Sequence, residues 1–345
     1  MNDTAQNSFF QIRKLGEVTS TNDVIKEAIS KGEQEGLVVT AISQTGGYGR
    51  RGNPLTSQPG GLYMSLLLRP DVNANKLQSL GLLAAIAVCR LIASFLPAEQ
   101  RGIVQIKWPN DVVIMFSPEQ QSSIENSRPK QSSSNLDNSS NPANCNSHSF
   151  FNKICGISVE SKDGAVCVGI GINVRHHLPD PSTYATDIFM TEKEANKTNA
   201  TDVERIRSNA SETNATDATK TGTSLKAVFS SNPRNIPTYL EDLSTSESFS
   251  IDMIRDRFLV EFADLYPTWQ HDGFSPFRKE FLQRFALEGF KIRIDDCSSD
   301  PIKCEVLDIN NLGHLIVLPE GDTKPKTIAS GSITIIDNSD QSTSN

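Results

Sequence analysis

Residues 153–173 read KICGISVESKDGAVCVGIGIN, and this stretch indicates the fold more clearly than any other part of the chain. Apolar residues fill two short runs, 154–160 and 166–172, whose length is typical of buried strands. Between them, Lys162-Asp163-Gly164 is a turn signal. The stretch therefore predicts two strands joined by a tight turn.

Similar patterns continue on both sides of this hairpin. Apolar runs predict further strands at 36–43, 62–68, 103–106 and 112–115. Helical periodicity and capping residues predict helices at 22–31, at 76–96, after Ser250 and from Ser275-Pro276. From Phe290 onward the apolar period changes to two, which predicts a small C-terminal β-barrel or sandwich.

The composition is that of a globular core with polar interruptions. The chain has 345 residues, a net charge of −8 and only 37% hydrophobic residues. Two Ser- and Asn-rich stretches, 117–150 and 191–235, lower that fraction, and we expect them to be disordered insertions in an intact core. The acidic balance argues against non-specific binding to nucleic acid or to a membrane surface.

Three further classes are disfavoured. The N-terminal residues lack the apolar region of a secretory signal. The longest apolar run, LGLLAAIAVCRLIASFL at 80–96, is short for a membrane span and contains Arg90, so a buried helix is expected. The six cysteines form no CxxC pair, which predicts reduced, buried thiols in a cytosolic protein.

Two loops combine cations with flexible backbone. Residues 44–52 read QTGGYGRRG, in which glycines let backbone N–H groups converge on an anion and two arginines add charge. An ordinary turn between strands would explain the same glycines. Residues 107–111 read KWPND, where a cation, an amide and a carboxylate could hold a phosphate, a nucleoside and Mg²⁺. Here the alternative is a solvated turn with Trp108 in the core.

Two further features lie on the central hairpin. Lys153 begins its first strand, where a surface lysine that flanks the strand is the alternative interpretation. Gly169-Ile170-Gly171-Ile172-Asn173 has glycine at alternate strand positions. This pattern removes side chains from one face and often marks the close approach of a ligand, although a β-bulge would also explain it.

Taken together and in this order, Ser20-Thr21-Asn22, the glycine-rich loop, KWPND, Lys153-Ile154-Cys155-Gly156-Ile157 and Gly169-Ile170-Gly171-Ile172-Asn173 resemble the biotin protein ligase family. The resemblance extends from about residue 17 to 336, apart from the polar stretches. It implies an α+β fold, a mixed β-sheet packed on helices in a class II synthetase-like core, with a small SH3-like C-terminal β-barrel. The implied organisation is an N-terminal tail at 1–16, a catalytic domain at 17–287 with the two insertions, a barrel at 288–337 and a disordered tail at 338–345.

The resemblance also implies an activity. Members of the family join biotin to ATP as biotinyl-5′-adenylate, release pyrophosphate, and transfer biotin to a lysine of a carboxylase carrier domain. We therefore expect a cytoplasmic ligase with biotin, ATP and a biotin carboxyl carrier domain as partners, and Mg²⁺ accompanying ATP without a fixed protein metal site. Fewer than twenty residues precede Ser20, too few for a helix-turn-helix domain, so no DNA partner is expected, and no membrane partner. A homodimer through the sheet edge is left open.

Site residues follow from matching positions. The implied catalytic groups are Arg50, Lys107, Lys153 and Asp111, whose charges would bring a carboxylate against the α-phosphate. The biotin site would comprise Ser20, Thr21, Asn22, Gln44, Gly47, Tyr48, Arg50, Lys153, Gly169 and Gly171, with the last two glycines leaving room for the biotin ring. ATP would contact Arg50, Arg51, Lys107, Asn110 and Asn173. The loop from Gly47 to Leu55 would close over the reactive adenylate and exclude water.

Two departures and three alternatives accompany this interpretation. Tyr48 stands where the family often has Arg, and Leu55 stands where a Trp commonly stacks over the ligand. We hypothesise that Tyr48 supplies the missing aromatic face. The alternatives are a lipoate or octanoate ligase of related fold, a catalytically inactive biotin-binding module, and an α/β protein of another function.

Overall fold

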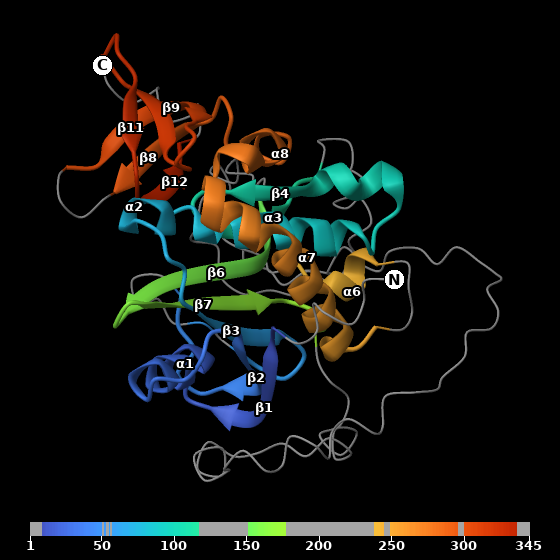
Figure 1. Ribbon diagram of the computed structural model, residues 1–345. Coiled ribbons are helices and arrows are strands. Elements are labelled where there is room, and N and C mark those ends of the chain that lie inside the picture. Colours follow the sequence, from blue (N-terminus) through green and yellow to red (C-terminus); the bar gives the residue numbers. More distant parts are fainter. Residues whose placement is uncertain are drawn as a thin grey trace, which may run out of the picture.

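The computed structural model describes residues 9–49, 52, 55, 57–116, 151–176, 238–244, 249–295 and 300–336. Within these ranges the chain forms a mixed sheet covered by helices and, beside it, a smaller antiparallel sheet near the C-terminus (Figure 1). The predicted α+β class with a small C-terminal SH3-like barrel is confirmed. The stretches 117–150 and 191–235 and the tail from residue 338, which were expected to be disordered, lie outside the described residues.

Seven of the described strands form the larger sheet, in the order β1-β2-β3-β7-β6-β5-β4. β1 and β2 are parallel, and the other neighbours are antiparallel. In the predicted central hairpin, Asp163 and Gly164 both have positive φ, as a two-residue Asp-Gly turn requires. The strands are β1 Gln11–Val18, β2 Leu37–Gln44, β3 Leu62–Leu68, β4 Val104–Lys107, β5 Asp111–Ile114, β6 Asn152–Lys162 and β7 Ala165–Ile172.

Helices cover the two faces of this sheet unequally. On one face α1 (Thr21–Ser30) contacts β2, β3 and β7, whereas on the other α3 (Leu80–Ala93) contacts β4, β5, β6 and α7 (Ile251–Asp272). The neighbours Val38 and Val39 belong to opposite cores, as the twofold period of a strand requires. The remaining described helices are short: α2 Ala74–Leu77, α6 Leu240–Leu243, α8 Arg278–Leu282, and 3₁₀ turns at Ala98–Ile103 and Ser275–Phe277.

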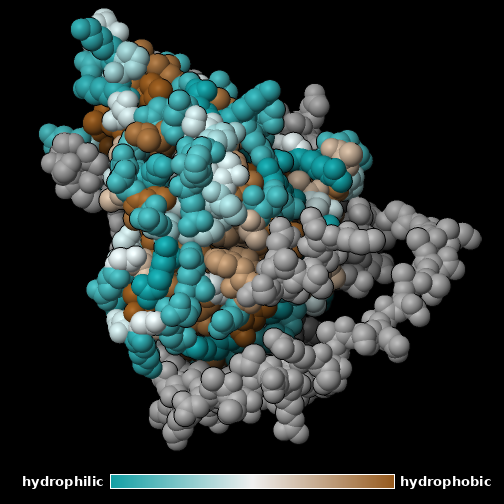
Figure 2. Space-filling model, viewed as in Figure 1, coloured by the Kyte–Doolittle hydropathy of each residue, from teal (hydrophilic) through white to brown (hydrophobic). Residues whose placement is uncertain are grey.

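The apolar run that could have been a membrane span is the core helix of the fold. The segment Ala74–Ala93 is long and apolar enough to cross a membrane, but 78% of its most apolar window is buried. On the face shown in Figure 2, hydrophilic residues cover most of the described surface. The helix predicted at 76–96 consists of two helices, α2 and α3, which are interrupted at Ser79. The Ser79 hydroxyl donates a hydrogen bond to Lys76 O and accepts one from the Trp269 indole N–H.

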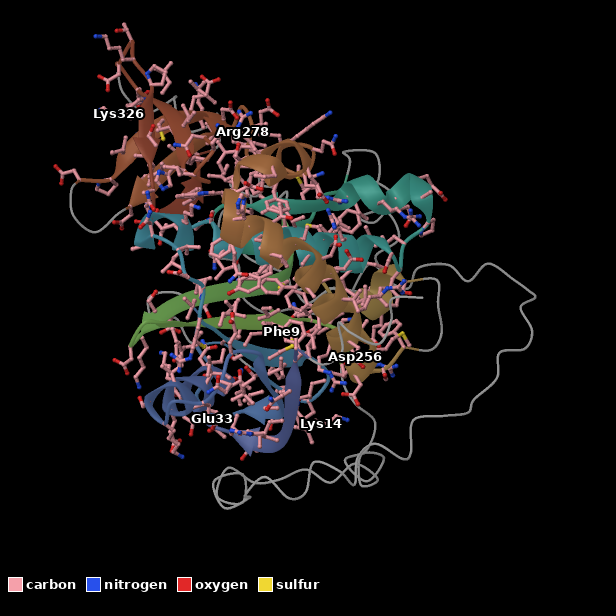
Figure 3. The ribbon with its side chains drawn as sticks, in the orientation of Figure 1. Phe9, Lys14, Glu33, Asp256, Arg278 and Lys326 are labelled. Atoms are coloured by element: carbon pink, nitrogen blue, oxygen red, sulfur yellow. The ribbon has the colours of Figure 1, made fainter. Side chains whose placement is uncertain are left out.

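The first strand was not predicted. β1 begins at Gln11, six residues before the expected boundary between tail and domain at residue 17. It is an edge strand in which only Leu15 and Val18 are buried, and its other residues are mostly polar, which explains why no apolar pattern marks it. Lys14 of β1 pairs with Asp252 of α7 at 2.6 Å, so β1 is an integral part of the core domain (Figure 3).

The smaller sheet has the order β11-β10-β9-β8-β12 and is antiparallel throughout. Its strands are β8 Lys291–Asp295, β9 Ile302–Ile309, β10 Leu315–Pro319, β11 Lys326–Ile328 and β12 Ser332–Ile335. Arg278 of α8 reaches this barrel and pairs with Asp308 at 2.5 Å (Figure 3). The turn at Gly313 also packs against Ser79 and Leu82, where a Cβ would lie 2.8 Å from the Leu82 side chain. The barrel is therefore docked firmly on the helical side of the core.

Candidate active site

The site is built on one row of residues that crosses the sheet. Tyr63 pairs with Gly171, Gly171 with Gly156, and Gly156 with Asp111. Asp111 pairs in turn with Lys107 across the β4–β5 hairpin. Directly paired residues point to the same face of a sheet, so the two charged residues and the glycines share the face that carries α1. The backbone of α1 packs mainly over β2, β3 and β7, so the face over β5 and the adjoining part of β6 is left open.

A pocket of about 370 Å³ lies over this open part of the face. It brings together residues from all four sequence segments singled out above. It is lined by Ser20, Thr21, Asn22, Gln44, Tyr48, Gly49, Leu55, Met64, Lys107, Trp108, Pro109, Asn110, Asp111, Lys153, Gly156, Ile157, Ser158, Gly169, Ile170, Gly171, Gly331, Ser332 and Ile333. Segments more than 300 residues apart in the sequence thus meet in one cavity.

One wall of the pocket is made by the N-terminus of α1. Ser20 is the N-cap residue, but its hydroxyl makes no capping hydrogen bond. Thr21 donates to Gln44 Oε1 from its backbone N–H (2.8 Å) and from its hydroxyl (3.1 Å), and Gln44 donates to Ser57 Oγ at 2.9 Å. The Gln44 amide is therefore fixed in orientation. A helix N-terminus with hydroxyl and amide groups suits a polar, hydrogen-bonding part of a ligand.

The opposite end of the pocket is cationic. Lys153 Nζ lies 2.8 Å from Asp111 Oδ1, and Gly156 makes this possible because a Cβ there would lie 2.9 Å from the Lys153 ammonium. The Lys107 ammonium lies 5.8 Å from the centroid of the Phe151 ring. Burial lowers the pKa of Lys107, the charge of Lys153 lowers it further, and Asp111 opposes both. Two cations and one carboxylate therefore share one end of the cavity.

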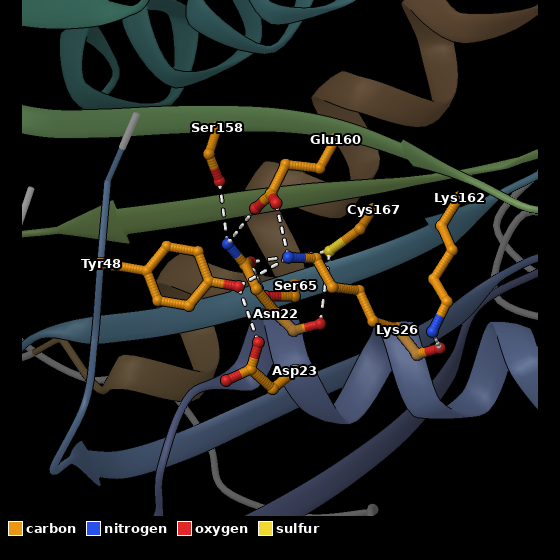
Figure 4. A network of polar contacts seen from close by, with 9 residues as sticks. All are labelled: Asn22, Asp23, Lys26, Tyr48, Ser65, Ser158, Glu160, Lys162 and Cys167. Atoms are coloured by element: carbon orange, nitrogen blue, oxygen red, sulfur yellow. Dashed lines mark hydrogen bonds and ion pairs between the residues drawn. The ribbon is translucent and has the colours of Figure 1, made fainter. Parts of the chain in front are cut away.

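Asn22 lines the pocket, but its side chain serves an internal network (Figure 4). Its amide donates to Ser158 and Glu160, at 3.1 and 3.2 Å, and its Oδ1 accepts from Ser65 at 2.7 Å. The space over Gly169, expected to accommodate the ligand ring, is filled by these groups, since a Cβ there would lie 2.5 Å from Ser158 Oγ and closer still to Asn22. Gly171 differs, because a Cβ there would meet Leu55 only at 3.5 Å.

Tyr48 also differs from expectation. Its hydroxyl accepts from Lys26 Nζ and donates to Asp23 Oδ1, each at 2.7 Å, so the side chain is tied to α1 (Figure 4). Tyr48 nevertheless lines the pocket, and its role as an aromatic face for the ligand stays a hypothesis. Leu55, 38% exposed, lies over Gly171.

Several predicted residues shape the site through the backbone. Asn110 donates to Ile157 O at 2.7 Å, and Asn173 donates to Lys153 O at 3.2 Å. Asn110 lines the pocket, whereas neither Asn173 nor Gly47 does. Gly47 is buried between Ser57 and Gln44, where a Cβ would lie 2.7 Å from the Ser57 hydroxyl. Arg50 and Arg51 lie outside the described residues.

The barrel contributes residues that sequence reasoning missed. Gly331, Ser332 and Ile333 line the pocket at the start of β12. The indole N–H of Trp108 donates to Gly313 O of the barrel at 2.9 Å, and the tryptophan is only 2% exposed. The KWPND turn is thus anchored to the barrel by a buried hydrogen bond. Among the described residues, no cluster of three or more His, Cys, Asp or Glu could hold a metal ion.

Residues 15–176 match the model of the Biotin/lipoate A/B protein ligase family. The match covers just under half of the chain, and over this part the chain is similar to the family. The matched range contains the α1 wall, the glycine-rich loop, KWPND and the central hairpin, which is the whole pocket apart from its barrel side. The resemblance seen in the sequence is confirmed.

Known relatives of this ligase family align with part of the chain. It is 42% identical over 99 residues to the bifunctional ligase/repressor BirA of Bacillus subtilis, and 41% identical over 99 residues to that of Bacillus spizizenii. Each alignment covers 28% of this chain and 29% of the relative. The chain thus spans under a third of the length of the curated relatives that it matches.

Solved structures share the fold over nearly the whole chain. The biotin protein ligase from Aquifex aeolicus, in complex with biotin and ATP, has a TM-score of 0.59 at 19% identity and covers 94% of this chain and 98% of its own. A biotin protein ligase-like protein of unknown function from Silicibacter sp. TM1040 has a TM-score of 0.52 at 10% identity and covers 93% and 94%. At these identities the likeness shows the fold alone.

Proposed function

We propose that this chain is a cytoplasmic biotin protein ligase. It activates biotin with ATP to biotinyl-5′-adenylate and transfers the biotinyl group to a lysine of a biotin carboxyl carrier domain. The observation that carries the proposal is one pocket with two unlike ends, the polar α1 wall at Ser20, Thr21 and Gln44 and the cationic end at Lys107 and Lys153. Biotin itself has two unlike ends, a hydrogen-bonding ureido ring and a carboxylate.

The first half-reaction needs the cationic end. A biotin carboxylate oxygen attacks the α-phosphorus of ATP, the bond to the β-phosphate breaks, and pyrophosphate leaves with the electron pair. Anion meets anion, so fixed cations lower the barrier. Lys153 would hold the carboxylate and α-phosphate, and Lys107 would face the phosphates. Arg50 and Arg51, next to Gly49 of the pocket, would add charge from the glycine-rich loop.

Mg²⁺ would enter with ATP. Asp111 is the carboxylate among the described lining residues, and Mg²⁺ that is bound to phosphates commonly uses only one or two protein carboxylates. The donor set therefore fits an ion carried by the nucleotide, which would neutralise phosphate charge. Asn110 would contact the nucleotide, which would extend toward the barrel residues Gly331 and Ser332. Asn173, which does not line the pocket, would support this site through its hydrogen bond to Lys153 O.

The second half-reaction uses the same cavity. The neutral amine of the acceptor lysine attacks the carbonyl carbon of the mixed anhydride, AMP leaves, and the amine loses a proton. Asp111 would accept that proton or orient the amine. Exclusion of water until the carrier docks preserves the anhydride, which is the role we propose for the loop from Gly47 to Leu55.

The experiment is transfer to a carrier. The purified chain is incubated with ATP, Mg²⁺, an isolated biotin carboxyl carrier domain and either biotin or lipoate, and the intact mass of the carrier is measured. A mass increase with biotin alone, absent in a carrier whose acceptor lysine is replaced by arginine, supports the proposal. An increase with lipoate alone would instead assign the chain to the lipoate branch of its family. No increase in carrier mass with either acid would contradict the proposal and favour a catalytically inactive binding module.

A further inference from the structure

The residue Lys26 lies outside the pocket and has no role in the chemistry above, yet it connects three elements. It is on α1, one turn after Asn22, and therefore on the same side of the helix. Its ammonium pairs with Glu160 of β6 at 2.5 Å and donates to Tyr48 Oη at 2.7 Å (Figure 4). It also lies 5.1 Å from the centroid of the Tyr48 ring.

Tyr48 is the residue of the glycine-rich loop that this lysine holds. Asp23, on the first turn of α1, accepts a hydrogen bond from the Tyr48 hydroxyl, so two α1 side chains bind one phenol. The residue before it, Gly47, accepts a hydrogen bond from Leu55 N–H at 2.8 Å. Tyr48 is thus tied to α1, and Leu55 is tied to the residue that precedes Tyr48.

The charges favour this arrangement. Burial alone would lower the pKa of Lys26, but its hydrogen bonds to Glu160 and Tyr48 and the nearby carboxylate outweigh that effect and raise it. Burial raises the pKa of Tyr48, and Asp23 adds to the rise, although the hydrogen bond from Lys26 opposes both. An ammonium between a carboxylate and a neutral phenol is therefore the stable state near neutral pH.

The same contacts continue into the pocket wall. Glu160 also accepts from Asn22, Asn22 Oδ1 accepts from the Ser65 hydroxyl, and the Ser65 and Thr21 hydroxyl oxygens lie 2.7 Å apart. Thr21 then binds Gln44, which binds Ser57 just beyond the loop. A single chain of polar contacts thus joins the two ends of the glycine-rich loop to the wall that would bind the ureido ring.

We propose that Lys26 is a positioning residue that clamps the glycine-rich loop, through Tyr48, onto the α1 wall of the pocket. This role rests on the proposed ligase function. With the clamp, Tyr48 and the neighbouring residues 45–49 are held against α1 before biotin binds. Without it, biotin binding must order these residues, so affinity for biotin falls.

Two kinds of measurement test the clamp, and the first, hydrogen exchange, does not require the chain to have ligase activity. Hydrogen exchange of the backbone amides at 45–49 should quicken about tenfold in Lys26→Met and in Tyr48→Phe, with no further increase in the double variant. Lys26→Arg, which can still donate to Glu160 and Tyr48, should restore protection. Lys31→Met is the matched control, because Lys31 is the C-cap residue of the same helix and pairs with Glu27 at the surface.

In the ligase assay, Lys26→Met should raise KM for biotin about tenfold while kcat changes less than about threefold. Lys26→Arg should return KM to near wild type. Unchanged exchange and unchanged KM in Lys26→Met would overturn the clamp, as would equal effects in Lys31→Met. If the wild-type chain releases no pyrophosphate, the ligase proposal fails, and the exchange measurement still decides whether Lys26 holds the loop.

Discussion

Lys153 Nζ and Asp111 Oδ1 lie 2.8 Å apart, across the boundary between β6 and β5 at the cationic end of the pocket. The ion pair is partly exposed, at 41% for the lysine side chain and 25% for the aspartate, so its contribution to stability is small. Its position, beside the half-buried Lys107, is what connects it to the proposed chemistry.

We predict that Lys153→Ala lowers the rate of biotin-dependent pyrophosphate release by at least about a hundredfold, since one of the cations facing the transition state is lost. The unfolding free energy should change by no more than about 1 kcal/mol. Lys291→Ala, at an exposed barrel position, is the control and should leave both quantities near wild type. Wild-type rates in Lys153→Ala would remove Lys153 from the site.

Substitutions at the two glycines of β7 should have different effects, one on the stability of the fold and the other on ligand binding. Gly169→Ala forces a methyl group onto Ser158 and Asn22, so we predict a loss of about 1–3 kcal/mol in unfolding free energy. Gly171→Ala meets only Leu55, at 3.5 Å, and should keep its stability while weakening biotin binding. Urea unfolding and biotin titration would measure the two effects. Equal destabilisation by both variants would contradict this division.

Trp108→Phe should affect the site through the barrel. The substitution leaves Gly313 O without its buried donor and should lower the unfolding free energy by about 2 kcal/mol. Trp269→Phe is matched, because that buried indole also donates one hydrogen bond at 2.9 Å, to Ser79. Both should lose stability, but only Trp108→Phe should slow pyrophosphate release, by about tenfold or more. Similar rates in the two folded variants would show that the Trp108 anchor does not position KWPND.

An ion pair far from the pocket should give the fold a defined pH dependence. Arg90 of α3 binds Glu280 of α8 through two hydrogen bonds, at 2.9 and 2.7 Å, and these lower the pKa of Glu280 below its ordinary 4.5. The pair therefore stabilises the fold above about pH 4.5, and the stabilisation is lost as pH falls through the lowered pKa.

Glu280→Gln should accordingly cost about 1 kcal/mol of unfolding free energy at pH 7 and much less at pH 3. Parallel urea titrations of wild type and variant at the two pH values would measure the difference. The exposed Glu320→Gln should show neither effect. A difference that grows toward low pH would contradict the assignment.

The sequence predicted most of the elements that build the site, because their signals are local. The β6–β7 hairpin carries its own turn residues, and Ser250 caps α7 through Met253 N–H as expected. β1 was missed because an edge strand with exposed polar residues has no apolar pattern. KWPND and the hairpin glycines could be singled out for the same reason, because each is a short motif of neighbouring residues.

What could not be predicted depends on distant packing. The barrel residues Gly331–Ile333 reach the pocket only because the barrel docks on α3 and Trp108. The contacts of Tyr48 depend on the packing that brings Lys26 and Asp23 of α1 to it. Whether the space over Gly169 is open depends on the orientation of the Asn22 side chain. No short motif encodes these contacts.

The measurement that tests the central claim most directly is pyrophosphate release by the purified chain, with ATP and Mg²⁺ but without any carrier. The account predicts release that requires biotin, is not supported by lipoate, and stops near one equivalent per chain because the adenylate stays bound. A folded chain that releases no pyrophosphate with biotin would contradict it.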